Sequence, residues 1–193
     1  MSGEKTNPNR RSVRLPNYDY TQAGAYFLTL VTYKRNRLFG NIVQGEMHLS
    51  PIGAVVKEVW LSIPAHFPHV SIGTFFIMPN HIHGILSINY TGDVQHVGSM
   101  QQRQARPLVQ SWPPEKYEKF GKPVKGSIPT IIRSVKSEAT RRVNLLRGIP
   151  GEKLWQRNYY EHVIRDDEDY QAIHDYIVTN PYHWKDDNEY IAP

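Results

Sequence analysis

The stretch that most constrains the fold is Met78-Pro79-Asn80-His81-Ile82-His83-Gly84, because it lies between two runs rich in β-branched and aromatic residues. Such runs predict β-strands, here 70–78 and 82–88, and the Pro-Asn pair predicts a bulge or tight turn between them. Alternate side chains of a strand point to the same face. We therefore predict that His81 and His83 lie side by side at the start of the second strand.

Two imidazoles on a rigid strand suit a divalent metal ion, but hard and borderline cations also need oxygen ligands. The ordinary alternative is a half-exposed strand, in which polar and apolar residues alternate without binding a metal. Tyr176 and Asn180 favour the metal site, because i,i+4 spacing near the end of a predicted helix puts the phenol and the amide on one face. Asn180 is then a candidate oxygen ligand, and Tyr176 is a candidate nucleophile beside it.

Composition narrows the kinds of site that the chain can hold. Its 193 residues include no cysteine, which excludes disulfides and thiolate ligands. The length favours one well-cored domain, 1–193. The first residues lack an apolar core, and no run approaches the ~18 apolar residues of a membrane span, so we expect a cytoplasmic protein that does not contact the membrane.

The positive charge is concentrated in part of the chain. The net charge is +5 and the pI is about 9.3, which favours a polyanionic partner. Segment 100–147 has eleven Lys or Arg against three Glu, whereas 161–193 has nine acidic residues against two basic ones. A solvated surface is the alternative explanation for any single charge. The predicted DNA-binding residues are Arg10, Arg11, Arg14, Arg133, Lys136, Arg141, Arg142 and Arg157.

Caps and periodicity predict the remaining elements. Ser50 and Ser127 each precede an early proline and an apolar face at helical spacing, which is typical of a helix start. A basic N-terminal arm is expected at 1–14 and a long surface insertion at 90–126. The predicted order is a strand 25–33, a short strand or hairpin 41–49, a helix 51–63, strands 70–78 and 82–88, a helix 127–146, a strand 154–164 and a helix 168–179 that Pro181 terminates. This order predicts the α+β class, with an antiparallel sheet and helices on one face.

These motifs resemble those of the single-tyrosine HUH transposases, and most closely the REP-associated tyrosine transposases. His81-Ile82-His83 matches the His-hydrophobic-His motif, Tyr176 matches the nucleophile, and Asn180 matches the polar residue that assists the metal. The likeness extends over about residues 10 to 185. Further matching stretches are Arg11-Ser12-Val13-Arg14-Leu15-Pro16, Gly24-Ala25-Tyr26-Phe27-Leu28-Thr29, Leu38-Phe39-Gly40 and Trp155-Gln156-Arg157-Asn158-Tyr159-Tyr160-Glu161-His162-Val163-Ile164-Arg165.

The resemblance implies a ferredoxin-like or RRM-like nuclease core with the catalytic tyrosine on a C-terminal helix. It implies an endonuclease and strand transferase that uses Mg²⁺ or Mn²⁺ and acts on single-stranded DNA hairpins, in DNA transposition or in processing of REP elements. His81, His83 and Asn180 would bind the metal, and Tyr176 would form a 5′-phosphotyrosine intermediate. We also expect a monomer or homodimer, associated with the nucleoid in the bacterial cytoplasm.

Other interpretations stay open from the residues alone. A nucleic-acid-binding regulator would keep the fold and the basic surface without cleaving DNA. A metal-dependent phosphoesterase with water as nucleophile would need the histidines but not the tyrosine. Tyr159, Tyr160 and Tyr170 are rival nucleophiles that also fit core or stacking roles, and His162 is a rival metal ligand.

Overall fold

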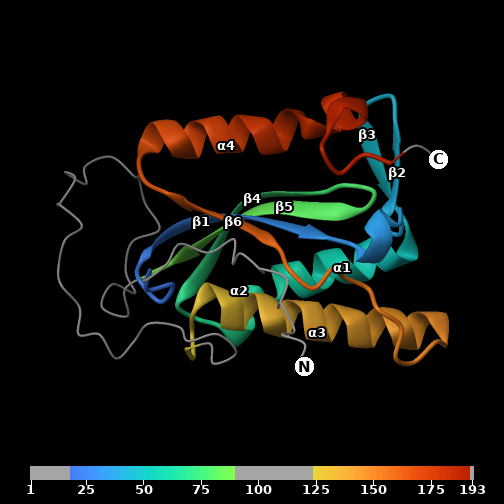
Figure 1. Ribbon diagram of the computed structural model, residues 1–193, viewed down its shortest axis with the longest axis horizontal. Coiled ribbons are helices and arrows are strands. Elements are labelled where there is room, and N and C mark those ends of the chain that lie inside the picture. Colours follow the sequence, from blue (N-terminus) through green and yellow to red (C-terminus); the bar gives the residue numbers. More distant parts are fainter. Residues whose placement is uncertain (1–17, 90–123, 192–193) are drawn as a thin grey trace, which may run out of the picture.

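The computed structural model describes residues 18–89 and 124–191, in which a four-stranded sheet lies between two layers of helices (Figure 1). The spatial order of the strands is β4-β5-β1-β6, and every neighbouring pair is antiparallel. The strands are β1 (Gly24–Val31), β4 (Val70–Ile77), β5 (His81–Ile88) and β6 (Tyr160–Ile164). A helix separates β1 from β4 and another separates β5 from β6, which is the ferredoxin-like βαββαβ arrangement. The predicted α+β fold with an antiparallel sheet is confirmed.

Serine hydroxyl groups start the two long helices where the sequence predicts them. In α1 (Pro51–Leu61), Oγ of Ser50 accepts a hydrogen bond from the amide of the third helical residue at 3.0 Å. In α3 (Ile128–Arg147), Oγ of Ser127 accepts in the same way at 3.4 Å. Gly148 ends α3 in a left-handed conformation with φ of 65°. A short helix, α2 (Ile63–His66), follows α1.

The main core lies between one face of the sheet and the helices α1 and α3. Gly84 of β5 lets the fully buried ring of Trp60 approach the strand, since a Cβ atom there would lie 2.5 Å from Cζ2 of that ring. The close approach therefore requires glycine at this position. The buried side chains of this core include Tyr26, Leu28, Leu30, Trp60, Ile82, Leu86, Ile131, Val135 and Ala139.

A smaller core lies on the opposite face of the sheet, beneath α4 (Asp167–Thr179). Phe27 and Ile85 point into it, and Ile177 of α4 packs against them. Because β1 is apolar on both faces and Ile85 of β5 adds to the second one, both faces need a cover. Helices were expected on one face; α1, α2 and α3 lie there, whereas α4 covers the other face (Figure 1). The helix that was expected to carry the nucleophile therefore shares a face with the two motif histidines.

One predicted strand is shorter than expected. The predicted strand 154–164 begins only at Tyr160, as β6. The carbonyl groups of Gln156 and Asn158 accept hydrogen bonds from Nζ of Lys136, each at 2.9 Å. Because Lys136 satisfies these two carbonyl groups, the strand is interrupted between Tyr160 and Trp155, which forms an isolated antiparallel bridge with Thr32 just after β1.

Small elements complete the described chain. The predicted strand or hairpin 41–49 is a hairpin of β2 (Gly40–Val43) and β3 (Glu46–Leu49), which forms a separate sheet. A 3₁₀ turn, η1 (Tyr33–Arg35), follows β1. As predicted, α4 ends just before Pro181, but a second 3₁₀ turn, η3 (Asn180–Asp186), then continues the chain.

Part of the predicted basic surface cannot be placed. The arm 1–14, with Arg10, Arg11 and Arg14, and most of the insertion 90–126 lie outside the described residues. In the part of the chain that the structure describes, no helix has the length and hydropathy needed to cross a membrane.

Candidate metal and nucleophile site

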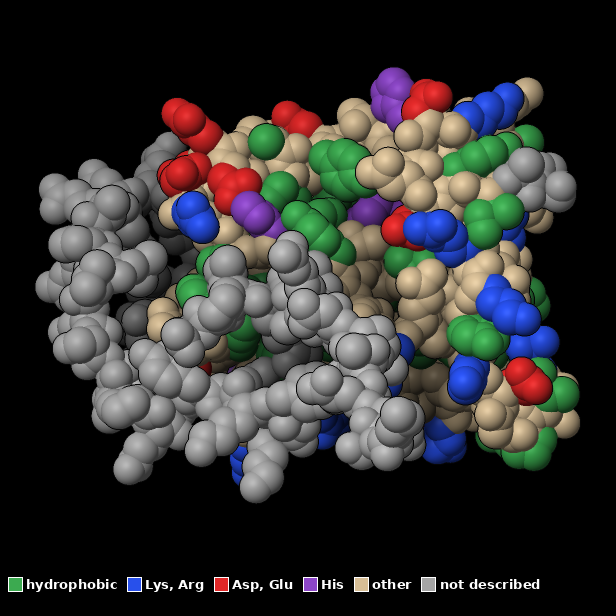
Figure 2. All heavy atoms as spheres, viewed as in Figure 1, with side chains coloured by type: hydrophobic (Ala, Val, Ile, Leu, Met, Phe, Trp, Pro, Cys, Tyr) green, Lys and Arg blue, Asp and Glu red, His purple; other side chains and the backbone are tan. Residues whose placement is uncertain are grey.

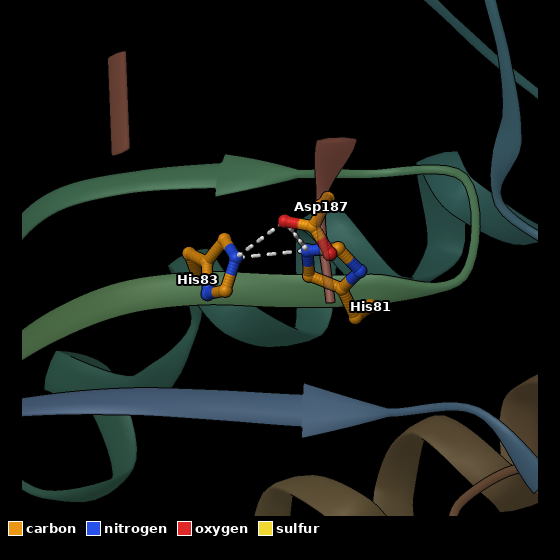
Figure 3. A group of neighbouring side chains, drawn as sticks. All are labelled: His81, His83 and Asp187. Carbon is orange, nitrogen blue, oxygen red and sulfur yellow. Dashed lines mark hydrogen bonds and ion pairs between the residues drawn. The ribbon is translucent and has the colours of Figure 1, made fainter. Parts of the chain in front are cut away.

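His81 and His83 at the start of β5 meet Asp187, which follows η3 (Figure 3). The two Nε2 atoms are 2.9 Å apart, and Oδ2 of Asp187 lies 3.9 Å from the first and 3.7 Å from the second. Both imidazoles are buried. Imidazole nitrogens together with a carboxylate oxygen are a common donor set for divalent metal ions.

The spacing of these atoms fits a single ion. Metal–donor distances of roughly 2.1 Å limit the separation of two donors of one ion to about 4.2 Å, and all three pairs lie within that limit. Oδ1 of Asn180 is buried and has no hydrogen-bond partner among the described residues. Nδ2 of the same side chain donates to Asp187 at 2.8 Å, so the unpartnered oxygen belongs to a side chain of this cluster. The residues present therefore fit a bound divalent cation.

Asn80 and Thr29 orient the two imidazoles. Nδ2 of Asn80 donates to two backbone carbonyl groups, which directs its Oδ1 at Nδ1 of His81, 2.8 Å away. Nδ1 of His81 therefore carries the proton, and Nε2 presents a lone pair to the cluster. Oγ1 of Thr29 lies 2.9 Å from Nδ1 of His83 and holds the orientation of that ring. Such outer contacts fix the tautomer and orientation of metal-binding histidines.

The electrostatics of the cluster favour the protonation states of His81 and Asp187 that can bind a metal ion. Burial, and then the neighbouring His83, lowers the pKa of His81 well below its usual value, so the imidazole is neutral at pH 7. Burial alone would raise the pKa of Asp187, but hydrogen bonds with His83 and Asn180 outweigh it and hold that pKa below its usual range. A neutral imidazole and an ionised carboxylate are the forms that bind metals.

Tyr176, near the end of α4, directs its hydroxyl group at the same cluster. Its Oη lies 3.2 Å from Nε2 of His83 and 3.5 Å from Oδ2 of Asp187. Burial, followed by the negative charge of Asp187, raises the pKa of the phenol to about 12. The side chain is 43% exposed, so a substrate can reach it. A nearby positive charge is what this phenol needs to become a nucleophile at neutral pH.

The structure brings together four residues that the sequence singled out, and it engages three of their rivals elsewhere, whereas the fourth rival, Tyr160, lies on the same face of the sheet as His83. Tyr170 packs into the smaller core beneath α4. The ring of Tyr159 lies against Lys136, 5.6 Å from Nζ. Nε2 of His162 bonds to Asp169 at 2.8 Å, in a partly buried pair outside the histidine cluster. The four residues brought together are His81, His83, Tyr176 and Asn180.

Sequence reasoning missed Asp187. It lies eleven residues beyond Tyr176, in a stretch without helical periodicity. Tertiary contacts bring it back: the buried ring of Trp184 lies 5.9 Å from that of His81, and the carbonyl of Glu189 accepts from the Asn80 amide at 2.7 Å. The acidic pair at 186–187 is the signal in the sequence, and its spacing from the histidines carries no information about this contact.

The predicted DNA-binding residues of α3 lie in the helix layer across the sheet from the histidine cluster (Figure 1). Arg141 and Arg142 both pair with Glu138, with N–O distances of 2.8 Å and 2.6 Å. Arg133 is exposed on the same helix, and Arg157 is exposed in the segment before β6. The contribution of these side chains to DNA binding stays a prediction.

Comparisons with known proteins agree with this fold and site. No protein-family model matches the sequence. An uncharacterised protein of Haemophilus influenzae is 37% identical over 187 residues, which cover 95% of this chain and 94% of that protein. A second Haemophilus influenzae protein, named as a REP-associated tyrosine transposase, is 25% identical over 168 residues. These residues cover 84% of this chain and 73% of that protein.

One solved structure has the same fold. It is a REP-associated tyrosine transposase bound to a REP hairpin, with a TM-score of 0.55 and 18% sequence identity. The match covers 93% of this chain and 74% of the solved one. The fold is therefore shared over nearly the whole length of the chain.

Proposed function

Because the chain belongs to the single-tyrosine HUH transposase family and is most like its REP-associated members, we propose that it cleaves and rejoins single-stranded hairpin DNA. The observation that supports this most strongly is the 3.2 Å distance between the hydroxyl of Tyr176 and Nε2 of His83. A phenol beside a set of metal donors can act as a nucleophile on a phosphodiester.

We propose that Mg²⁺ or Mn²⁺ binds to His81, His83 and Asp187, with Oδ1 of Asn180 as a further ligand, directly or through water. When bound, the ion would supply positive charge to the phenol and to the non-bridging phosphate oxygens. The acidic oxygen comes from Asp187, so Asn180 is not the sole oxygen ligand of the proposed site. Asn180 also holds that carboxylate through its 2.8 Å hydrogen bond.

In the proposed reaction, Oη of Tyr176 attacks the phosphorus of the scissile phosphodiester. The phenol loses its proton, a bond between Oη and phosphorus forms, and the bond from phosphorus to the 3′ oxygen breaks. The 3′ oxygen takes up a proton and leaves as a hydroxyl group, while the 5′ end stays on the protein as a phosphotyrosine. Attack by another 3′-hydroxyl on this ester would join strands, without any nucleotide cofactor.

The proposed substrate sets the biological context. The related protein in the solved structure is bound to a REP hairpin, so we propose palindromic single-stranded DNA for this chain, in DNA transposition or REP-element processing. We propose that the protein acts at the nucleoid in the bacterial cytoplasm, as a monomer or homodimer. The proposed phosphate contacts are Arg10, Arg11, Arg14, Arg133, Arg141, Arg142 and Arg157. The predicted contact Lys136 is not among them, because its ammonium group is enclosed by the chain and donates to two backbone carbonyl groups.

The test is covalent trapping on labelled hairpin oligonucleotides taken from the flanks of the gene. Incubation with Mn²⁺ should yield a DNA–protein adduct on a denaturing gel, and a chelator or Tyr176→Phe should abolish it. Tyr182→Phe is the matched control, because this exposed tyrosine of η3 should leave the adduct unchanged. Cleavage without an adduct would instead support a water nucleophile. Tight binding without cleavage would support a DNA-binding regulator.

A further inference from the structure

Tyr160 lies in the same row of the sheet as His83. The strand register pairs Thr29 of β1 with His83 on one side and with Tyr160 on the other. Residues directly opposite each other in a sheet point to the same face, and neighbouring strands lie about 4.8 Å apart. Tyr160 is therefore roughly 10 Å from His83 on the face that carries the candidate site. Among residues 18–89 and 124–191, β6 is an edge strand of the sheet, so this row leads from the histidines to that edge.

The row is flanked by aromatic rings that link Tyr160 to the nucleophile. The ring of Phe27 lies 6.0 Å from that of Tyr160 and 6.0 Å from that of Tyr176, in both cases edge to face. Phe27 is buried, whereas Tyr160 is 49% exposed. Tyr160 thus rests on a fixed aromatic support that it shares with Tyr176, and it presents its ring to solvent on the same face of the sheet.

The backbone before Tyr160 is held by α3. Nζ of Lys136 donates to the carbonyl groups of residues 156 and 158, and its charge lies over the ring of Tyr159. Burial lowers the pKa of Lys136 to about 8, as expected of an ammonium group enclosed by the chain. Tyr159 packs against the main core, so alternation along the strand turns Tyr160 to the other face. A ring held in place in this way loses little conformational entropy when it binds a ligand.

Charge restricts the route by which a DNA strand reaches this row. The first turn of α4 contains Asp167, Glu168 and Asp169, and Figure 2 shows acidic side chains gathered at that end of the helix. Lys and Arg side chains gather on the opposite side of the same view. A phosphodiester backbone is repelled by the acidic end. The exposed Arg157 lies three residues before Tyr160, at the end of β6 away from these acids.

We propose that Tyr160 is a stacking platform for a base of the single strand close to the scissile phosphate, and that Arg157 contacts a phosphate beside that base. This inference rests on the proposed function, because it requires single-stranded DNA at Tyr176. Stacking of a base on an aromatic side chain tolerates every base and changes affinity by a factor of about 5 to 150. Tyr160 would therefore position the strand for attack without reading its sequence.

The test measures binding in a Tyr176→Phe background, in which the DNA is not cleaved. Fluorescence anisotropy would compare labelled oligo(dT) with an abasic oligonucleotide of the same length and charge. Tyr160→Ala should weaken oligo(dT) binding about tenfold and leave abasic binding unchanged, whereas Tyr160→Phe should retain both affinities. Tyr182→Ala, which removes a more exposed tyrosine, should change neither. Circular dichroism would verify that each variant is folded.

Two results would overturn the proposal. One is unchanged oligo(dT) binding in Tyr160→Ala, and the other is an equal loss of affinity for both oligonucleotides. The covalent trapping assay separates this failure from failure of the proposed function. An adduct through Tyr176 without any Tyr160-dependent preference for bases would refute the stacking platform alone, whereas such a preference without an adduct would refute the proposed cleavage.

Discussion

At the residue scale, Asp187 gives the donor set a negative charge that two imidazoles and an amide lack. We expect Asp187→Asn to weaken Mn²⁺ binding about 10- to 100-fold, because the amide keeps the size of the side chain but not its charge. Titration calorimetry would measure the affinity. Asp186→Asn is the matched control, since this exposed neighbour should leave binding unchanged. Equal affinities in the two variants would show that the carboxylate is not a ligand.

The lowered pKa of His81 predicts how stability depends on pH. In the unfolded chain this histidine takes up a proton below about pH 6.5, whereas in the folded protein burial keeps it neutral to a lower pH. The free energy of unfolding should therefore decrease as the pH falls from 7 to 5. The lowered pKa of Asp187 acts in the same direction only below about pH 4.

Urea unfolding with a chelator present, at pH 7 and pH 5, would measure this dependence. His81→Gln should have a smaller difference between the two pH values than the wild type, because glutamine does not titrate. A difference as large as that of the wild type would mean that other groups cause the loss of stability.

Local patterns in the sequence were enough to find four residues of the candidate site. Strand alternation predicted that His81 and His83 share a face, and helical spacing predicted that Tyr176 and Asn180 lie together, as they do. Asp187 could not be predicted, because an irregular segment returns it to the site through tertiary contacts. The same reason applies to side chains such as Asn80, whose orienting role depends on backbone carbonyl groups distant in sequence.

At the element scale, β5 must pack closely on α1 to hold its two histidines in place. A Cβ atom at Gly84 would lie 2.5 Å from the ring of the buried Trp60. We expect Gly84→Ala to lower the free energy of unfolding by about 1–3 kcal/mol, as overpacked cores generally do. Ser87→Ala on the same strand, a partly exposed position, should change it by less than about 0.5 kcal/mol. Equal unfolding free energies of Gly84→Ala and Ser87→Ala, measured in urea, would mean that the Trp60 ring can move aside.

The helix α3 also fixes the segment that precedes β6. Lys136→Met should lower the free energy of unfolding by about 1–3 kcal/mol, because two carbonyl groups lose a charged donor. Arg133→Met, an exposed position on the same helix, should cost less than about 0.5 kcal/mol. Urea unfolding of both variants would compare them, and equal stabilities would mean that the ammonium group does not hold this segment.

Local signals in the sequence located the helices and strands better than they predicted the tertiary contacts around them. The caps at Ser50 and Ser127 located two helices, because a cap acts within a few residues. The predicted strand 154–164 is interrupted before β6, because a lysine from another helix binds two of its carbonyl groups, although Trp155 still pairs with Thr32 beyond the end of β1. Apolar residues lie on both faces of β1, and this pattern is the sequence signal for a helix on the second face. The prediction of helices on one face rested on the order of the elements and did not take this signal into account.

At the scale of the whole molecule, the candidate metal site joins two parts of the chain about one hundred residues apart. His81 and His83 belong to β5 in the sheet, whereas Asp187 belongs to the segment after η3, so an ion bound to all three would cross-link the fold. An ion that binds only the folded state stabilises it by about 2.7 kcal/mol at 100 times its dissociation constant. We therefore expect Mn²⁺ to raise the free energy of unfolding of the whole domain.

Urea unfolding with Mn²⁺ or with chelator would measure this increase. It should be lost when both histidines are replaced, in His81→Gln/His83→Gln, and it should be retained in His66→Gln, which changes a histidine of α2 outside the cluster. An equal increase in the double variant would place the bound ion elsewhere. Because the ion would link the sheet to the segment after the tyrosine helix, the same contacts that stabilise the fold would also fix Tyr176 relative to the donors.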